Sequence, residues 1–444
     1  MGYSEKVHHA YTQRADSSMS VPGMTKLRRT AFPRKAAYLV LSACFTLLFF
    51  VYIHERTSSK DVLVILKTGA TEIRDKLLVH LNTTLRCYPD YMLFSDYEEN
   101  FHGQHVYDAL EYVTPEIQEK HGDFELWRRL QEGGHSALKP QELSGPVSKP
   151  QENNSGKPSN PGWKLDKWKF LPMVNRTYHE YPSKKWYIFV ETDTYILWQT
   201  LLNYLAALDE TKPYYIGAQV WIGHILFAHG GTGFAVSNPA MKNVTEMFQE
   251  HQAHWEGFTS NHWAGDCILG KAFADSGTPL TKAWPIWQGD DIGRVTYWRE
   301  DGPRRQWCAP AVSYHHLGPG AINDLWEFEQ GWIKNTSGDS SAFLRHKDMF
   351  SQYLLPKIEE PRANWDNHAN DDLGPVQSLQ ECGELCEDDG KCLQYRLTPD
   401  LRCLSGTRPM LGEWAKGVES GWVVERIREW GEEMEQCGND TWIT

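Results

Sequence analysis

The stretch KKWYIFVETDTYILWQ, from Lys184 to Gln199, limits what this chain can fold into more than any other part of it. Its residues from Trp186 to Val190 are all bulky and apolar. A continuous apolar run of this length is typical of a central strand that is covered on both faces, as in a parallel sheet. Leucines then recur at helical spacing from Leu197 onward. We therefore expect an α/β fold whose central strand ends at Glu191.

Carboxylates and hydroxyls follow this predicted strand directly, as Glu191, Thr192, Asp193 and Thr194. In open α/β sheets, ligands bind at the carboxyl ends of the strands. Hard oxygen ligands at that edge suit a divalent cation that carries the phosphates of a nucleotide. The simpler alternative is that Asp193 or Thr194 caps the following helix. Capping would not account for Glu191.

The preceding sequence predicts the opening of the same sheet. Asp61 to Glu72 indicates a buried strand, a glycine turn just after Thr68 and the start of a helix, and Tyr91 to Glu99 indicates a second strand. This order is typical of a parallel α/β sheet. The stretch from Gly133 to Gly162 is rich in Gly, Pro, Ser and Asn and predicts a flexible insertion. Because the sheet pattern resumes after it, residues 54–355 are predicted to form one domain.

The N-terminal part predicts a membrane anchor. Residues Ala36 to Ile53 carry no charge over about the minimum length that spans a bilayer. Basic residues cluster between Lys26 and Lys35, just before this segment, so residues 1–35 are expected in the cytosol and the remainder in the lumen. A cleaved signal peptide is the rival interpretation. The long polar segment in front and the lack of a small-residue cleavage site favour the retained anchor, which makes this a single-pass type II protein.

Other features suit the secretory pathway, in the membrane of the Golgi or the endoplasmic reticulum. Sequons for N-glycosylation begin at Asn82, Asn153, Asn175, Asn243, Asn335 and Asn439. Apart from Cys44 in the predicted anchor, eight cysteines remain, an even set that suits disulfides in an oxidising lumen. The net charge of −13 argues against nucleic acid as a partner.

Four sequence blocks resemble family 31 glycosyltransferases, in particular the fungal relatives of the core 1 β1,3-galactosyltransferase group. The block WYIFVETDTYI is similar to the family's strand and D-x-D region, and GGTGFAVSNPAM, from Gly230, to its G-G-[AS]-G-[YF] segment. GDCILGKAF, from Gly265, resembles the E-D-V block, and VSYHHLGP, from Val312, resembles the late V-S-[FY]-H segment. The blocks follow in the family's order between about Asp61 and Glu329. The resemblance implies a GT-A-type, Rossmann-like nucleotide-sugar transferase domain.

The resemblance also implies roles for the matching residues. Asp193 is the expected metal ligand, and His315 is expected to complete the metal site from the late loop. Glu191 is expected near the ribose or a metal-bound water. Asp266 is the implied general base, which takes the proton from the acceptor hydroxyl as that hydroxyl attacks. By family analogy the cation is Mn²⁺, which suits Asp and His ligands and stabilises the departing UDP.

Further residues are expected to bind the nucleotide-sugar. They are Thr68, Thr192, Gly231 and Gly233, the two glycines most simply as turn positions where the backbone approaches the ligand. Tryptophans such as Trp263 suit either the acceptor site or the core.

Two positions depart from the family pattern. The middle acid of the D-D-D triplet is Thr192 here, and the acid before Asp266 is Gly265. These departures leave the donor sugar open and keep a second function in view, that of a non-catalytic folding partner or lectin. His316 adjoins His315, so either ring could be an ordinary loop histidine. A metallohydrolase ranks last because no dense ligand motif such as H-E-x-x-H is present.

The leading interpretation is a metal-dependent, inverting glycosyltransferase. By family analogy it moves a sugar, galactose first of all, from a UDP-sugar to a glycan or glycoprotein acceptor in β1,3 linkage. The other partners we expect are the membrane and, as an open option, a second copy of the chain in a homodimer.

The C-terminal part predicts a separate module. Residues 356–375 are polar, contain Pro361 and Pro375, and indicate a linker. Residues 376–444 then carry cysteines at a C-x3-C spacing and two further cysteines nearby. The pattern resembles a small α+β PAN/apple-like domain, and the resemblance implies the pairs Cys382–Cys403 and Cys386–Cys392. A zinc site is the rival, with poor spacing for it.

Four cysteines are then left, namely Cys87, Cys267, Cys308 and Cys437. A Cys267–Cys308 bridge would brace the loop that carries Asp266 and is a candidate pairing. Sequence cannot fix this connectivity, so the other pairings stay open.

Overall fold

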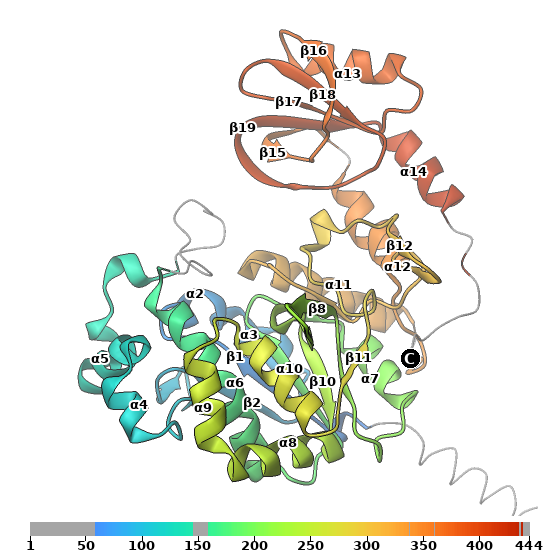
Figure 1. The fold of residues 1–444 in the computed structure, drawn as a ribbon. Coiled ribbons are helices and arrows are strands. Elements are labelled where there is room, and N and C mark those ends of the chain that lie inside the picture. Colours follow the sequence, from blue (N-terminus) through green and yellow to red (C-terminus); the bar gives the residue numbers. More distant parts are fainter. Residues whose placement is uncertain (1–57, 145–158, 337, 359, 435–436, 438–444) are drawn as a thin grey trace, which may run out of the picture. The chain divides into compact units, whose positions relative to one another are not determined.

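The computed structural model describes residues 58–144, 159–336, 338–358, 360–434 and 437 (Figure 1). These residues belong to one compact unit, Arg56–Thr444. The predicted cytosolic tail (1–35) and anchor (36–53) lie outside the described residues. Within the part that is described, no helix combines the length and the apolar character needed to cross a membrane.

An eight-stranded mixed sheet forms the centre of the N-terminal domain, with strand order β11-β7-β10-β5-β1-β2-β4-β3. Its strands are β1 (Val62–Lys67), β2 (Tyr91–Ser95), β3 (Glu99–Phe101), β4 (Gln104–Asp108), β5 (Trp186–Glu191), β7 (Tyr215–Gly217), β10 (Phe234–Ser237) and β11 (Leu280–Lys282). Strand β5 lies in the interior beside β1, in parallel register from Val62 opposite Trp186 to Lys67 opposite Glu191. Its apolar residues are buried because both faces of the sheet are covered.

The sheet is not purely parallel. Strand β10 runs antiparallel to both β5 and β7, with Phe234 opposite Phe189. Because β10 is reversed, its first residues lie at the edge where β5 ends. The glycine segment before β10, Gly230–Thr232 and Gly233, is thereby brought beside Glu191. The direction of this strand was not predicted from the sequence.

Helices cover both faces of the sheet (Figure 1). Helices α6 (Pro161–Glu180), α8 (Asn238–Glu250), α9 (Gln252–Ser260) and α10 (Gly265–Asp275) pack on one face through an apolar cluster that includes Phe170, Met241, Trp255 and Ile268. The other face packs on α2 (Ile73–Lys76) and α7 (Trp198–Ala206), with Leu201 and Leu205 buried. The result is the three-layer α/β arrangement that places ligands at the strand ends.

The remaining elements of this domain surround the sheet. The helices are α3 (Leu78–Asn82), α4 (Pro115–Lys120), α5 (Glu125–Gly133), α11 (Pro319–Asn335) and α12 (His346–Met349), followed by a π-helical turn, Phe350–Leu354. Three short two-stranded sheets add β8 (Gln219–Ile222) with β9 (Ile225–Ala228), β12 (Glu300–Asp301) with β13 (Arg304–Arg305), and β6 (Tyr195–Ile196) with β14 (Ser313–Tyr314).

The predicted insertion, 133–162, has ordered ends. It begins with the last residue of α5 and continues into the 3-10 turns Gly134–Ala137 and Pro140–Glu142. At its other end, Asn160 caps α6 by accepting a hydrogen bond from the Gly162 N–H. Residues 145–158 lie outside the described part.

The C-terminal module begins earlier than the sequence predicted. Residues 356–375 are not only a linker, because they supply two strands, β15 (Arg362–Asp366) and β16 (Asp371–Pro375). These are the edges of an antiparallel five-stranded sheet of order β15-β19-β17-β18-β16. The other strands are β17 (Gln394–Leu397), β18 (Arg402–Gly406) and β19 (Glu413–Trp422). The helices are α13 (Leu379–Asp388) and α14 (Val424–Glu433).

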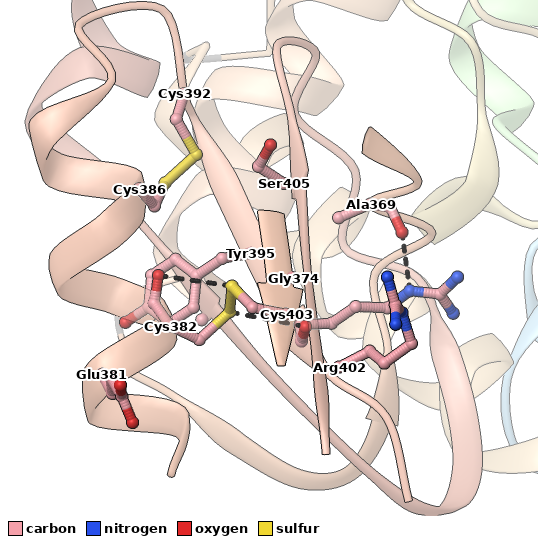
Figure 2. Close-up of a disulfide and its surroundings, with 12 residues drawn as sticks. Ala369, Gly374, Glu381, Cys382, Cys386, Cys392, Tyr395, Arg402, Cys403 and Ser405 are labelled. Carbon is pink, nitrogen blue, oxygen red and sulfur yellow. Dashed lines mark hydrogen bonds between the residues drawn. A yellow bond between two sulfur atoms is a disulfide. The ribbon is translucent and has the colours of Figure 1, made fainter. Parts of the chain in front are cut away.

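Two disulfides hold α13 to this sheet (Figure 2). Cys382 bonds to Cys403 of β18, and Cys386 bonds to Cys392, just before β17. These are the two pairs that the resemblance implies. The C-x3-C spacing places both thiols of α13 on the helix face that meets the sheet.

The candidate Cys267–Cys308 bridge is not formed. Cys308 bonds instead to Cys437, which follows α14. Cys267 is a buried free thiol in α10, and Cys87 is a half-buried free thiol. From its position in α10, the Cys267 side chain packs in an apolar cluster with Phe227 and Ala264. Cys267 therefore serves as a small core residue.

Four of the six sequon asparagines lie in the described residues. Asn82, Asn243 and Asn335 are exposed, whereas Asn175 is half-buried in α6 and accepts a hydrogen bond from Gln249 at 2.9 Å. Asn153 and Asn439 lie outside the described residues. The three exposed positions leave their side chains accessible for modification.

Candidate functional site

Three chain segments meet where β5 ends. Strand β5 delivers Glu191 and Asp193, and the reversed β10 delivers Gly230 and Gly231. The small sheet of β6 and β14 pairs Tyr195 with Tyr314, which brings the next residue, His315, next to the carboxylate segment. The Leu317 N–H also donates to the Asp193 carbonyl at 2.9 Å. Thr194 and His315, which are 121 positions apart in the chain, thus lie in one site.

The site opens into a cavity of about 620 Å³. Its wall includes the β1–α2 loop, the first turns of α6, Glu191, Asp193, His315 and His316. Its charged lining consists of five carboxylates (Glu72, Asp166, Glu191, Asp193, Glu413) and four cations (Lys67, Lys76, Lys169, Arg294). An anionic ligand such as a diphosphate therefore finds no surplus of positive charge in the side chains alone.

Glu191 is held by a buried lysine. Lys67, the last residue of β1, lies 3.0 Å from the Glu191 carboxylate and 2.6 Å from that of Asp166 in α6. Burial opposes the charge of Lys67, but the two carboxylates outweigh it and raise its pKa. Burial likewise opposes ionisation of Glu191, and Lys67 overcomes this and lowers the carboxyl pKa. Glu191 is therefore an ionised, fixed carboxylate.

Asp193 carries one engaged and one unengaged oxygen. Its Oδ2 accepts a hydrogen bond from Lys76 at 3.0 Å. Its Oδ1 is buried and has no hydrogen-bond partner, although it lies 3.3 Å from His315 Nδ1. Burial opposes ionisation of Asp193, yet the charge and hydrogen bond of Lys76 help to hold the pKa of this carboxyl well below the usual range. An ionised, buried oxygen without a hydrogen bond is a strong candidate for a metal ligand.

A hydroxyl orients the His315 ring. Thr194 Oγ1 donates its single proton to the Gly231 carbonyl at 2.6 Å. The same hydroxyl lies 2.9 Å from His315 Nδ1, so it must accept a hydrogen bond from an Nδ1–H. Burial lowers the pKa of His315 against the pull of Asp193, which favours the neutral ring. The neutral Nδ1–H tautomer leaves Nε2 with the lone pair that can bind a metal.

These residues fit a divalent cation. Asp193, His315 and His316 each offer a ligand atom within 4.8 Å of the others. The set of one carboxylate and two imidazoles suits Mn²⁺ or a similar ion. A divalent charge would also convert the excess of carboxylates in the cavity lining into a net positive charge. Gly231 makes room for the ring, because a Cβ there would lie 2.2 Å from His315 Nε2.

Thr68 and Thr192, expected to bind the nucleotide-sugar, lie behind the cavity wall. Both are buried, and their hydroxyls are 3.4 Å apart. The Thr192 carbonyl accepts a hydrogen bond from His80 Nε2 at 2.9 Å, and the other ring nitrogen lies 2.8 Å from Thr84 Oγ1. Burial lowers the pKa of His80 to about 4, so the ring stays neutral. His80 therefore holds the backbone between Glu191 and Asp193 in place through a buried hydrogen bond to the Thr192 carbonyl.

Asp266 lies in a second, smaller cavity of about 170 Å³. It stands in the first turn of α10, where its two oxygens accept hydrogen bonds from the N–H groups of Gly230 (2.9 Å) and Cys267 (2.8 Å). Burial raises the pKa of Asp266 although both hydrogen bonds oppose the shift. A carboxylate that is both fixed and made more basic by burial suits proton transfer.

The two cavities share a wall of four residues, Trp163, Asp166, Glu191 and His315. A molecule in the first cavity and a molecule in the second would therefore be separated by little more than these side chains.

The glycines at the family-specific positions have steric roles. Gly233 has a positive φ of 76°, and a Cβ there would lie 3.1 Å from the Phe189 carbonyl. A Cβ on Gly265 would lie 2.3 Å from Phe170 of α6. The close approach of α10 and α6 therefore excludes a side chain at Gly265, where the family pattern has an acid.

The sequence missed several residues of the site. No sequence motif contains Lys67, Lys76, Asp166 or His80. Thr194 was considered only as a helix cap. Capping is not its role, because α7 begins at Trp198 and its N-cap is Leu197, without a side-chain cap. One signal was present: Lys67 stands at the end of an otherwise apolar strand, where a buried charge requires a partner.

Comparisons with known proteins agree with part of the expectation. Residues 164–283 match a family model described as Fringe-like. This range contains Asp193, Gly231 and Asp266 and ends before His315. No curated protein sequence matches the chain. One solved structure, a glycosyltransferase involved in the glycosylation of the major capsid of PBCV-1, aligns with 60% of this chain and 99% of its own, at 12% identity and a TM-score of 0.27. Residues 164–283, called the Fringe-like segment below, are therefore similar to a family of GT31-type glycosyltransferases.

Proposed function

We propose that this protein is a metal-dependent, inverting glycosyltransferase. In this proposal it transfers a sugar, galactose first of all, from a UDP-sugar to a glycan or glycoprotein acceptor in β1,3 linkage. The observation that carries the proposal is the pairing of two adjoining cavities within and beside a Fringe-like segment. One cavity holds the Asp193–His315 cluster and the other holds Asp266.

The first cavity would bind the UDP-sugar. Asp193 and His315 would hold a divalent cation, Mn²⁺ in our proposal, with His316 as a third candidate ligand. When bound, that cation supplies positive charge that stabilises the diphosphate of the departing UDP. Lys76, buried beside Asp193, adds a fixed positive charge to the same wall. Glu191 would contact the ribose or a metal-bound water.

The second cavity would place the acceptor hydroxyl at Asp266. The Asp266 carboxylate takes the proton of that hydroxyl while its oxygen forms the bond to the anomeric carbon of the donor sugar. The bond from the anomeric carbon to the phosphate oxygen breaks, and its electron pair leaves with UDP. Attack on the face opposite the leaving group inverts the anomeric configuration. The hydrogen bonds from Gly230 and Cys267 keep the carboxylate in position through this step.

We also propose a location and a role for the flanking parts. The apolar segment 36–53 would anchor the chain as a type II protein of the Golgi or endoplasmic reticulum, and three disulfides favour an oxidising compartment. The disulfide-bonded C-terminal module would be PAN/apple-like and bind protein or carbohydrate. Exposed Asn82, Asn243 and Asn335 would be the accessible glycosylation sites.

The test uses the full chain, purified in a detergent without a sugar headgroup. UDP is titrated calorimetrically with Mn²⁺ and again with EDTA, for the wild type, for Asp193→Ala and for the control Asp275→Ala. Asp275 is an exposed carboxylate of α10 that lines neither cavity and forms an ion pair with Lys271. We expect Mn²⁺-dependent UDP binding in the wild type and the control and its loss in Asp193→Ala.

Transfer is tested separately with Asp266→Asn. This variant should keep Mn²⁺-dependent UDP binding and lose sugar transfer, because it removes the proton acceptor and only one of the two backbone hydrogen bonds to this side chain. If the wild type does not bind UDP under either condition, the proposal fails and the folding-partner or lectin alternative replaces it.

A further inference from the structure

We infer that the Asp266 cavity and a row of aromatic rings, two of which line it, form a saccharide subsite, which binds a pyranose ring of the acceptor. We call Phe258, His262, Trp263 and Trp163 the aromatic row. The inference rests on the proposed function for the identity of the acceptor, but it makes a binding claim of its own.

The rings of the aromatic row are nearly parallel. The planes of Phe258 and His262 differ by 21°, those of His262 and Trp263 by 7°, and those of Trp263 and Trp163 by 16°. The centroids of the two indoles are 6.3 Å apart. The row joins the end of α9 and the loop before α10 to the first turn of α6. Elements of the Fringe-like segment and its immediate N-terminal boundary therefore bring four nearly parallel rings together, and two of them, Trp163 and Trp263, line the cavity.

Core packing does not explain Trp263. Its side chain is 59% exposed, whereas Trp255 and Trp287 are 2% and 0% exposed and belong to the apolar clusters. A large exposed aromatic side chain at the rim of a polar cavity is typical of a ligand-contacting surface. Trp263 lines the Asp266 cavity directly, as does Trp163.

The cavity lining combines the rings of Trp163 and Trp263 with polar groups. Asp166, His229 and Asp266 line it, and the His229 ring stands edge-on to His315 with centroids 5.8 Å apart. A pyranose ring presents C–H groups on its faces and hydroxyls around its rim. Aromatic faces and convergent carboxylate and imidazole groups match these two surfaces of one ligand.

The size of the cavity limits what enters it. Its volume of about 170 Å³ is below the roughly 300–1,000 Å³ of pockets that hold drug-sized ligands. One monosaccharide unit is therefore the largest part of an acceptor that we expect inside. Trp163 lines both cavities, so a pyranose held against it would lie beside the proposed donor site.

The test measures sugar binding independently of UDP. Saturation-transfer NMR is recorded on the full chain in a detergent without a sugar headgroup. The probes are methyl β-galactoside, methyl α-N-acetylgalactosaminide, methyl β-glucoside and methyl α-mannoside. The variants are Trp263→Ala, Trp263→Phe and the matched control Trp221→Ala. Trp221 of β8 is 57% exposed and lines neither cavity.

We expect at least one probe to bind and Trp263→Ala to weaken its binding by about fivefold or more, since an aromatic contact contributes on the order of 1 kcal/mol. Trp263→Phe should restore most of the binding, and Trp221→Ala should leave it unchanged. All three variants should bind UDP with Mn²⁺ as the wild type does.

Two results would overturn the inference while leaving the proposed function standing: no probe binds although UDP does, or Trp263→Ala binds the probe like the wild type. Loss of probe binding in Trp221→Ala to the same extent would overturn it as well. Trp263-dependent binding of a probe without any UDP binding would support the subsite and reject the transferase proposal.

Discussion

Thr194 Oγ1 lies 2.9 Å from His315 Nδ1, and this contact selects the tautomer of the ring. The hydroxyl gives its own proton to the Gly231 carbonyl, so it can only accept from the imidazole. A residue adjacent to Asp193 in the chain thereby sets which nitrogen of His315 is available as a ligand. Outer-shell partners of metal-binding histidines commonly act in this way.

Thr194→Val should weaken Mn²⁺-dependent UDP binding by about 10- to 100-fold, because it removes the acceptor for Nδ1–H at nearly constant volume. Thr194→Ser keeps the hydroxyl and should bind within a few-fold of the wild type. Calorimetric titration of UDP at fixed Mn²⁺ measures both. Equal affinity of the valine and serine variants would show that the hydroxyl does not orient His315.

Gly231→Ala should also weaken metal-dependent UDP binding, by about tenfold or more, for a steric reason. The new Cβ would lie 2.2 Å from His315 Nε2, so the ring must move. Gly331→Ala is the matched control, because nothing lies within 4 Å of a Cβ at that position of α11. The control should bind UDP normally and be up to about 1 kcal/mol more stable. Normal UDP affinity in Gly231→Ala would place the ring elsewhere.

Glu329 predicts a pH dependence of stability. It is buried in α11, accepts hydrogen bonds from the Tyr195 hydroxyl (2.7 Å) and the Gln199 N–H (3.3 Å), and has its pKa raised by burial to about 7. The folded state therefore keeps a proton that the unfolded state releases above its ordinary carboxyl pKa, about 4.3. Stability from this group is fully present below that value and is lost as the pH rises to about 7.

Glu329→Gln removes this titration. From pH 4.5 to pH 8, the free energy of unfolding of the wild type should fall by about 3 kcal/mol relative to that of the variant. Urea unfolding of both proteins across this range measures the difference. The same pH dependence in both proteins would mean that Glu329 is ionised or protonated equally in the folded and unfolded states.

The cysteine pairing is directly measurable. Among the cysteines in the described part of the chain, alkylation of the denatured, unreduced protein should modify Cys87 and Cys267, and peptide mapping should find Cys308 joined to Cys437. Cys308→Ser should expose one new thiol, at Cys437, and leave the modification of Cys267 unchanged. A peptide that joins Cys267 to Cys308 would contradict the structure and restore the candidate pairing from the sequence.

Much of the site could be predicted from local patterns. The apolar run Trp186–Val190 predicted a covered central strand, and the residues after it were placed at the ligand-binding edge. Asp266 was placed from its block resemblance and stands at the start of a helix. The C-x3-C spacing placed Cys382 and Cys386 on one helix face. In each case the information lies within a few residues, where helical and strand periodicity relate sequence to geometry.

The rest depends on contacts between segments that are far apart in the chain. The reversal of β10, the Lys67–Asp166 and Lys76–Asp193 ion pairs and the Thr194–His315 hydrogen bond join residues that no local pattern connects. The Cys308–Cys437 bridge spans 129 residues, and cysteine counting allowed several pairings. Periodicity states which face of an element is buried, but not which neighbour covers it. That choice is made by the packing of the whole domain, and it decides which lysine neutralises each carboxylate and which nitrogen of His315 lies beside Asp193.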